Sequence, residues 1–459
     1  MAIKRSSIFL ISICIYSLLS FFWPDLEYFW SGYSDDSGLN IAMACIVHAI
    51  LYHLLAYNFS NYCRNPGFLK TPFAISCLVS IAYLGVPFLK YYGEARYVEF
   101  DIGLHYRLFA LLVVCASIFM ILKIYAKKWI LFYFKSHKAM HRSVGPLFVP
   151  LMYLIFGASS FYLIFGSIYL DLSVTQIVLI EAGYFISLYY FSLFGFEHKA
   201  LWNELLLLSG GLSITYFLGA RYALLLAVVV VVFGRISRIR SHQKRKSMAL
   251  LSLLLIPLVT LMILGPLTAM TKNRYGEISL NFELQRTDYV DFVGAASIAD
   301  YKENVFKGLY TSSLWAIPGS FIDKAGLDYS MEPFFDNNQW RSSDYREGYT
   351  LNTNDYPDSI FSCGAMVGGF VGALLFPLVW FGVFSMLLSQ LNNTLLLSFY
   401  LASVPSMFNI EIAYWTIVPT LRNWFVASIM LFVFIQITSF LYPKVKAYKE
   451  VDPRSETAA

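Results

Sequence analysis

The chain has 459 residues, of which 58% are hydrophobic and only 14% are charged. In soluble domains about a quarter of the residues are charged, so this composition excludes a water-facing fold built around a single core. The formal net charge of +5 is too small to indicate a nucleic-acid-binding protein. We therefore expect an all-α integral membrane protein.

Long apolar runs follow one another along most of the chain. A run of about 17–25 apolar residues crosses a bilayer as a helix, because a helix satisfies its own backbone hydrogen bonds there. The runs that qualify are 8–23, 38–59, 72–91, 104–125, 145–168, 174–194, 248–270, 359–389, 395–410 and 420–441. The stretch 200–234 is broken by Ser209-Gly210-Gly211 and by Gly219-Ala220-Arg221, so it predicts two short helices or a re-entrant pair.

Two basic segments determine the expected orientation. Residues 123–142 and residues 235–246 each contain six Lys and Arg residues and no acidic residue. Both should face the cytoplasm by the positive-inside rule. An even number of spans must then separate them, and four fit best, so 200–234 counts as two. The prediction is about 12 transmembrane helices with both termini in the cytoplasm.

The same parity places one large polar segment on the outer side. Residues 271–358 contain fourteen acidic residues against eight basic ones, together with Trp315 and Trp340. A connection longer than about 12–15 residues is usually functional or disordered, and this one is too aromatic for disorder. The domain organisation that follows is spans one to nine over 1–270, a large, partly helical periplasmic loop over 271–357, spans ten to twelve over 358–443, and a cytoplasmic tail over 444–459.

Two arginines are expected at the outer starts of spans. Arg221 follows Gly219-Ala220, and Arg422 follows Pro419-Thr420-Leu421. Ionisable side chains at membrane depth cost about 2.5–3.5 kcal/mol on insertion scales, so they need a reason. A guanidinium fork matches the oxygens of a diphosphate and stays charged at any pH. The alternative is that both side chains reach to the lipid headgroups beside Tyr222 and Trp424.

Carboxylates and further arginines supply candidates for catalysis and glycan binding. Asp358 or Ser359 is expected to cap the helix that begins there, which leaves Asp355 as the candidate base. Glu411 is a second catalytic candidate, or else an ion-pair partner of Arg422. The candidate glycan-binding residues of the loop are Arg274, Arg286, Arg341 and Arg346.

The sequence contains no motif for a metal site, and it contains one regular glycine pattern. None of the seven histidines lies in the loop, and no HExxH motif, His/Cys cluster or paired metal carboxylates occur, so no metal or other cofactor is expected. Gly364, Gly368 and Gly372 repeat at four-residue spacing. That stripe predicts close helix–helix packing, with a groove for a polyprenyl tail as the alternative.

This layout resembles that of the O-antigen polymerases (Wzy-type, oligosaccharide repeat-unit polymerases) and their relatives, the O-antigen ligases. Gly219-Ala220-Arg221 is similar to the family's Gly-x-Arg at the outer start of a span. Asp358-Ser359, followed by the stretch from Gly364 to Gly372, resembles the helix after the family's large loop. The resemblance covers the whole chain as topology.

The resemblance implies a polymerase in the bacterial inner membrane. Donor and acceptor would be undecaprenyl-diphosphate-linked oligosaccharides, with a chain-length regulator and a flippase as possible partners. Arg221 and Arg422 would stabilise the departing diphosphate, and a loop carboxylate would deprotonate the acceptor hydroxyl.

Four other functions stay open, one of which is another polyprenyl-phosphate glycosyltransferase. Ligases of the group use a periplasmic His, which this sequence lacks. A lipid-linked oligosaccharide flippase or transporter would favour two similar halves with short loops. A membrane-bound acyltransferase would use a buried His with an Asp partner, for which His48 and His53 are the intramembrane candidates.

Overall fold

The structure is a computed structural model that describes residues 10–15, 17–18, 38–85, 104–143, 200–218, 222–255, 359–389 and seven positions between 425 and 437. Within these ranges every regular element is a helix and no strand occurs. Three of the described helices are long and apolar enough to cross a membrane, at Ala42–Tyr62, Leu108–Leu131 and Gly368–Met386. The prediction of an all-helical membrane protein is therefore confirmed for this part of the chain.

Helix α3 (Gly38–Tyr62) leads through a one-turn helix, α4 (Pro66–Leu69), into α5 (Pro72–Gly85). Asn65 caps α4 because its side-chain oxygen accepts a hydrogen bond from Gly67 N at 2.9 Å. Thr71 does the same for α5, where its hydroxyl oxygen accepts from Ala74 N at 3.1 Å. Two successive polar caps therefore turn the chain from α3 into α5, and the one-turn helix between the two apolar runs is too short for the hydropathy pattern to reveal.

Helix α6 (Leu104–Ser143) is a single helix of 40 residues. At 1.5 Å per residue it is about 60 Å long, roughly twice the thickness of the hydrocarbon layer. We expected the span to end near residue 125 and the basic segment 123–142 to follow it. The helix instead continues through that segment, because the sequence from 104 to 143 contains no Gly or Pro that would end it.

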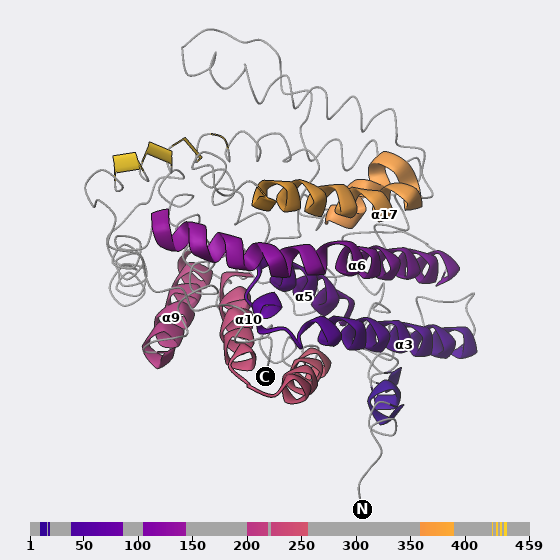
Figure 1. Ribbon diagram of the computed structural model, residues 1–459. Helices are drawn as coiled ribbons and strands as arrows, with labels where there is room; N and C mark the ends of the chain where they lie inside the picture. The colour runs from indigo at the N-terminus through magenta and orange to yellow at the C-terminus, as the bar shows by residue number, and fades with distance from the viewer. Residues whose placement is uncertain are drawn as a thin grey trace, which may run out of the picture.

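Helices α9 (Ala200–Leu218) and α10 (Tyr222–Ser237) pack against each other and divide the ambiguous stretch 200–234 into two helices, as counted. Helix α9 ends at Leu218 and α10 begins at Tyr222, while α9 runs unbroken through Ser209-Gly210-Gly211. In the view of Figure 1, α9 and α10 run across the direction of α3, α6 and α17. The apolar part of α10, Leu224–Ser237, is shorter than the three membrane-length helices. A further helix covers 242–255, so it begins inside the basic segment 235–246.

Helix α17 (Ile360–Ser389) begins where the sequence predicted, because Ser359 Oγ accepts a hydrogen bond from Phe361 N at 3.2 Å. The helix is interrupted at Gly368 and Gly369, and Gly369 has φ 61° and ψ −148°, a conformation essentially restricted to glycine. The backbones of Gly364 and Gly372 touch across this break. The glycine stripe was expected to serve packing between different helices; here two of its members bring the two halves of one helix together.

Helix α6 lies between α3 and α17 and contacts both (Figure 1). Three side chains of α6 donate hydrogen bonds to α17: Ser117 to the Leu374 carbonyl, Tyr125 to the Leu378 carbonyl, and Trp129 to Ser385 Oγ at 3.0 Å. Side-chain hydrogen bonds of this kind join helices where lipid offers no other polar partner. The α6–α17 pair is thus held by specific polar contacts as well as by packing.

An aromatic cluster joins six of the helices near the start of α5. Phe73 of α5 lies at its centre, with ring centroids 5.4 Å from Trp129 and 5.3 Å from Phe381. Phe68 of α4 lies 6.2 Å from Phe73, and Phe59 of α3 continues the cluster to Phe68 and Phe233. Aromatic pairs at these separations add about 0.5–1.5 kcal/mol each beyond their burial. This cluster is the best-defined core of the described structure.

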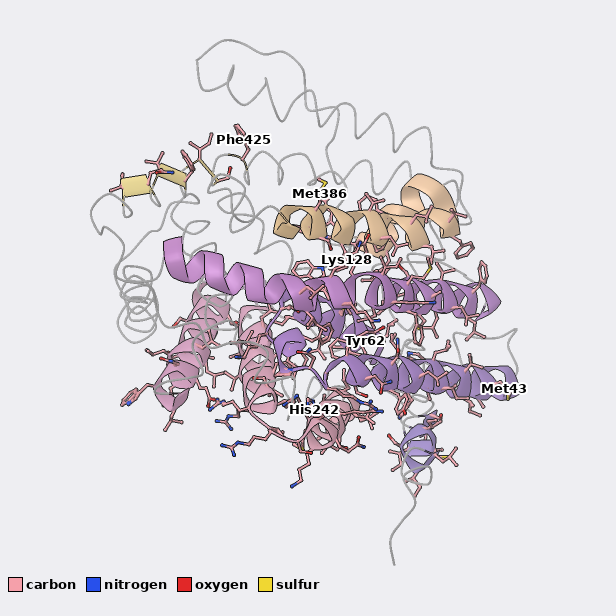
Figure 2. The ribbon with its side chains drawn as sticks, viewed as in Figure 1. Met43, Tyr62, Lys128, His242, Met386 and Phe425 are labelled. Carbon is pink, nitrogen blue, oxygen red and sulfur yellow. The ribbon has the colours of Figure 1, made fainter. Side chains whose placement is uncertain are left out.

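The outer faces of α3 and α17 are apolar as well. Exposed side chains recur at helical spacing, at Met43, Ile46, Ile50, Leu54 and Tyr57 on α3 and at Val371, Leu375, Val379, Val383 and Met386 on α17. Figure 2 shows Met386 on the side of α17 that faces away from α6. Apolar stripes of this length are a liability in water, but they suit a helix that faces lipid.

Candidate functional site

The residues that the sequence singled out for chemistry lie outside the described residues. They are Arg221 and Arg422 for the diphosphate, Asp355 and Glu411 for catalysis, and Arg274, Arg286, Arg341 and Arg346 for the glycan. Of the described residues, Leu218 at the end of α9 and Tyr222 at the start of α10 flank the connection that contains Arg221.

The described residues contain a different ionic cluster, at the opposite end of the α9–α10 hairpin. Glu204, in the first turns of α9, accepts hydrogen bonds from two arginines at the end of α10. Arg235 donates from Nε and Nη2 to Glu204 Oε2 at 3.1 and 2.6 Å, and Arg238 donates from Nη2 to Oε1 at 2.6 Å. One carboxylate is therefore shared between two guanidinium groups.

The cluster combines a buried anion with two accessible cations. The side chain of Glu204 is 5% exposed, whereas those of Arg235 and Arg238 are 64% and 41% exposed. Burial of an unpaired carboxylate is costly, and pairing with both arginines offsets that cost. Together with Leu201 these residues line an open hollow of about 410 Å³. The formal charge of the three groups is +1, so the hollow suits an anion.

A second basic residue near this end is buried and bonded to the backbone. Arg245 is 4% exposed and donates to the carbonyl oxygen of Arg64 and to that of Ile239. Burial lowers the pKa of its guanidinium. His242 Nδ1 also lies 3.0 Å from the Arg64 carbonyl oxygen. These contacts bind the segment after α10 to the end of α3, so Arg245 is placed for structure.

Lys246 provides a further link between the same segments. Its ammonium lies 4.0 Å from the centroid of the Tyr57 ring on α3. A cation–π contact of this kind is worth about 0.5–2 kcal/mol, depending on its exposure to water. Figure 2 shows nitrogen-tipped side chains gathered around this edge of the molecule, where His242 is labelled. Part of the basic segment 235–246 therefore binds the end of α3, and part of it is an exposed cationic surface.

The two histidines considered for acyl transfer lie among hydroxyl and carbonyl groups. His53 Nε2 lies 2.8 Å from Ser12 Oγ, and its Nδ1 lies 2.6 Å from the Ala49 carbonyl oxygen. His48 Nε2 lies 2.7 Å from the Leu84 carbonyl oxygen. The first contact joins the N-terminal helical segment to α3, and the last joins α3 to α5. Both histidines are thus placed to hold helices together.

Sequence reasoning missed the Glu204 cluster, although one signal for it was present. Glu204 is the only acidic residue in 200–234 and stands four residues into an apolar helix. A charge in such a position needs a partner, and two of the six cations of 235–246 supply it. The partner is revealed only when α10 is seen to return antiparallel to α9.

Among the described residues, no group of three or more His, Cys, Asp and Glu side chains is placed to hold a metal ion. In the Glu204 cluster, two guanidinium groups oriented by one carboxylate can recognise an anion. Comparison of the chain with protein-family models, with curated proteins and with solved structures found no match.

Proposed function

We propose that this chain is a metal-independent glycosyltransferase, a polymerase that joins undecaprenyl-diphosphate-linked repeat units into O-antigen or a related surface polysaccharide. The reaction takes place at the periplasmic face of the bacterial inner membrane. The observation that carries the proposal is the distribution of charge. Residues 271–358 hold fourteen acidic residues, whereas the basic segments 123–142 and 235–246 hold none.

The proposed reaction transfers a glycan between two lipid-linked substrates. A hydroxyl oxygen of the acceptor repeat unit attacks the anomeric carbon of the donor glycan, and the bond from that carbon to the diphosphate oxygen breaks. Asp355 takes the hydroxyl proton, with Glu411 as the second carboxylate of the site. Arg221 and Arg422 bind the charge that develops on the leaving diphosphate.

Two features of the described structure support this arrangement. Ser359 caps α17, so the acid-rich segment ends directly at a helix start. Asp355 precedes that cap by four residues, which keeps it within about 14 Å of the cap at the maximum reach of an extended chain. In the hairpin, Leu218 and Tyr222 lie at the end away from Glu204, so the connection with Arg221 is kept apart from the basic segment.

The experiment that tests the proposal is deletion of the gene, followed by electrophoresis of the surface glycan. We expect single repeat units attached to the lipid core and no longer chains, with full polymer restored by the intact gene. If no repeat unit reached the core, the ligase or flippase alternative would replace the polymerase. If long chains persisted, the chain would have no role in glycan assembly.

A further inference from the structure

We infer that the open end of the α9–α10 hairpin binds the phosphate of an anionic phospholipid headgroup, with Arg235 and Arg238 as its ligands. Glu204 orients the two arginines, and the neighbouring apolar side chains of α9 contact the acyl chains. This lipid site is separate from the proposed site of glycan transfer and does not depend on it. It lies at the other end of the hairpin from the connection that contains Arg221.

The two guanidinium groups are held in place at the hollow because both donate to Glu204, and Arg238 Nε also donates to the Gly234 carbonyl oxygen at 3.4 Å. Arg235 and Arg238 are three residues apart and so lie on one side of the end of α10. A guanidinium has five N–H donors, of which Arg235 uses Nε and one on Nη2 for Glu204. The other donors belong to a side chain that is 64% exposed and that lines the hollow.

Glu204 is buried and does not fill the hollow. Its two oxygens each accept from a different arginine at 2.6 Å, so the carboxylate fixes the separation of the two forks. An arginine on a solvated surface would lose side-chain freedom on binding a phosphate, which weakens the binding. Here that ordering is already present before the ligand arrives.

Exposed apolar side chains at the start of α9 indicate that the ligand is a lipid. Leu201, Trp202 and Leu205 occupy the first turns of α9 beside Glu204, and their exposed fractions are 63%, 66% and 50%. Tryptophan concentrates at the membrane–water interface, and cationic side chains just beyond it bind anionic headgroups. Leu201 lines the hollow together with the two arginines, and the exposed Leu and Trp side chains on the same turns of α9 match a phosphate carried on acyl chains.

The same features argue against a soluble anion. A binding site for free phosphate gains nothing from exposed Leu and Trp side chains, and in water these would be a liability. Exposed cations continue from the cluster along Arg240 and Lys244. A continuous cationic edge of this kind suits the negative surface of the cytoplasmic leaflet, which is the leaflet that the positive-inside rule assigns to residues 235–246.

Native mass spectrometry of the purified full-length chain in detergent tests the proposal, with dioleoylphosphatidylglycerol and dioleoylphosphatidylcholine as the added lipids. We expect preferential, saturable binding of phosphatidylglycerol. The double variant Arg235→Ala/Arg238→Ala should weaken that binding at least about tenfold, since each hydrogen bond to a charged group contributes about 1.5–3 kcal/mol. The matched control is Arg240→Ala/Lys244→Ala, which removes the same charge from the same segment without contact to Glu204. It should reduce the affinity by a clearly smaller factor than the test pair does, because these cations add to the charge of the edge but do not contact Glu204.

Two further variants separate orientation from bulk charge. Glu204→Gln adds one net positive charge but weakens the bonds that orient the arginines, so affinity should fall although the charge rises. Arg235→Lys/Arg238→Lys keeps the charge and the contact with Glu204, and so guards against a folding defect in the alanine variant. We expect intermediate binding from it. Equal losses in the test and control pairs, or tighter binding by Glu204→Gln, would overturn the inference.

A last comparison distinguishes a lipid from a free phosphate. Trp202→Ala should weaken the binding of dioleoylphosphatidylglycerol, and millimolar inorganic phosphate should fail to displace the lipid. Displacement by phosphate together with an unchanged affinity in Trp202→Ala would identify a site for a soluble anion and contradict the lipid assignment. Loss of lipid binding would leave the glycan phenotype of the gene deletion untouched, so the two proposals fail separately.

Discussion

At the scale of single residues, Arg245 has a structural contact, whereas Arg221 and Arg422 have a proposed role in substrate binding. Arg245 is buried and donates to main-chain carbonyl oxygens of Arg64 and Ile239. Buried carbonyl groups that lose their donor carry a desolvation penalty, which adds to the loss of the bonds themselves. A planar fork can reach two carbonyls at once, whereas an ammonium group is a single point of charge.

We therefore predict that Arg245→Ala lowers the free energy of unfolding by about 2 kcal/mol or more. Arg245→Lys should recover only part of that loss. Thermal unfolding of the purified protein in detergent measures both. Arg240→Ala is the control, because its side chain is exposed on the same segment and only its main-chain carbonyl accepts from Arg245. Equal melting temperatures for Arg245→Ala and Arg240→Ala would refute a structural role for the buried guanidinium.

Arg221 and Arg422 are proposed to bind a substrate. Loss of one oriented donor at a developing charge costs about 10²–10³ in rate at comparable sites. We predict that Arg221→Ala and Arg422→Ala abolish polymer while the protein still accumulates in the membrane. Lysine at either position should rescue poorly, because it lacks the bidentate fork. Glycan electrophoresis with a membrane immunoblot measures both quantities.

The lysine variants decide between catalysis and membrane anchoring. A lysine reaches the headgroups as well as an arginine does, so full polymer from both lysine variants at normal protein levels would remove these residues from the mechanism.

At the scale of one element, the glycines of α17 differ in how well they would tolerate a side chain. Gly369 adopts φ 61°, where a side chain costs about 1–3 kcal/mol. A Cβ on Gly364 would collide with the backbone of Gly372 and would come within 2.8 Å of Phe376 Cβ. A Cβ on Gly368 would meet nothing within 4 Å, at a negative φ of −142°. Equal spacing along the chain therefore does not mean equal tolerance.

We predict that Gly364→Ala and Gly369→Ala lower thermal stability and membrane accumulation, whereas Gly368→Ala is tolerated. The physical reason is a steric collision at the first position and backbone strain at the second. Fluorescence-detected size-exclusion chromatography of heated samples measures all three variants side by side. A ranking in which Gly368→Ala is the least stable would contradict the interrupted form of α17.

At the scale of the whole molecule, the described helices bring the basic segments and the aromatic core close together. Trp129 belongs both to the span of α6 and to the aromatic cluster, and Lys127 and Lys128 precede it directly. Arg245 and Lys246 contact the end of α3 near Phe59. A well-packed core beside a cationic edge fits one membrane boundary, and the positive-inside rule predicts that this boundary is the cytoplasmic one.

Reporter fusions test that orientation. We predict that a reporter fused after residue 143, where α6 ends, or after residue 241 reports the cytoplasm. A reporter fused after residue 320, within the acid-rich segment, should report the periplasm. Alkaline phosphatase and green fluorescent protein give opposite signals on the two sides. A cytoplasmic signal at residue 320 would overturn the expected count of spans and the proposed outer site.

The sequence is sufficient to indicate a membrane protein, the helical character, two possible breaks in 200–234 and a cap at Asp358 or Ser359. Each of these depends on local information. A backbone surrounded by lipid has to bond within its own segment, so an apolar run becomes a helix whatever its neighbours are. A capping side chain bonds two or three residues ahead, and its position is therefore visible in the sequence.

The tertiary structure alone decided three further features: the partners of Glu204, the continuation of α6 through its basic end, and the closure of Gly364 on Gly372. Glu204 and Arg235 are 31 residues apart, and hydropathy carries no information on which cation of 235–246 a returning helix will present. Similarly, glycines at four-residue spacing fit a continuous helix and a broken one equally well. Side-chain pairing between helices depends on packing angles and register, and these are properties of the assembled molecule.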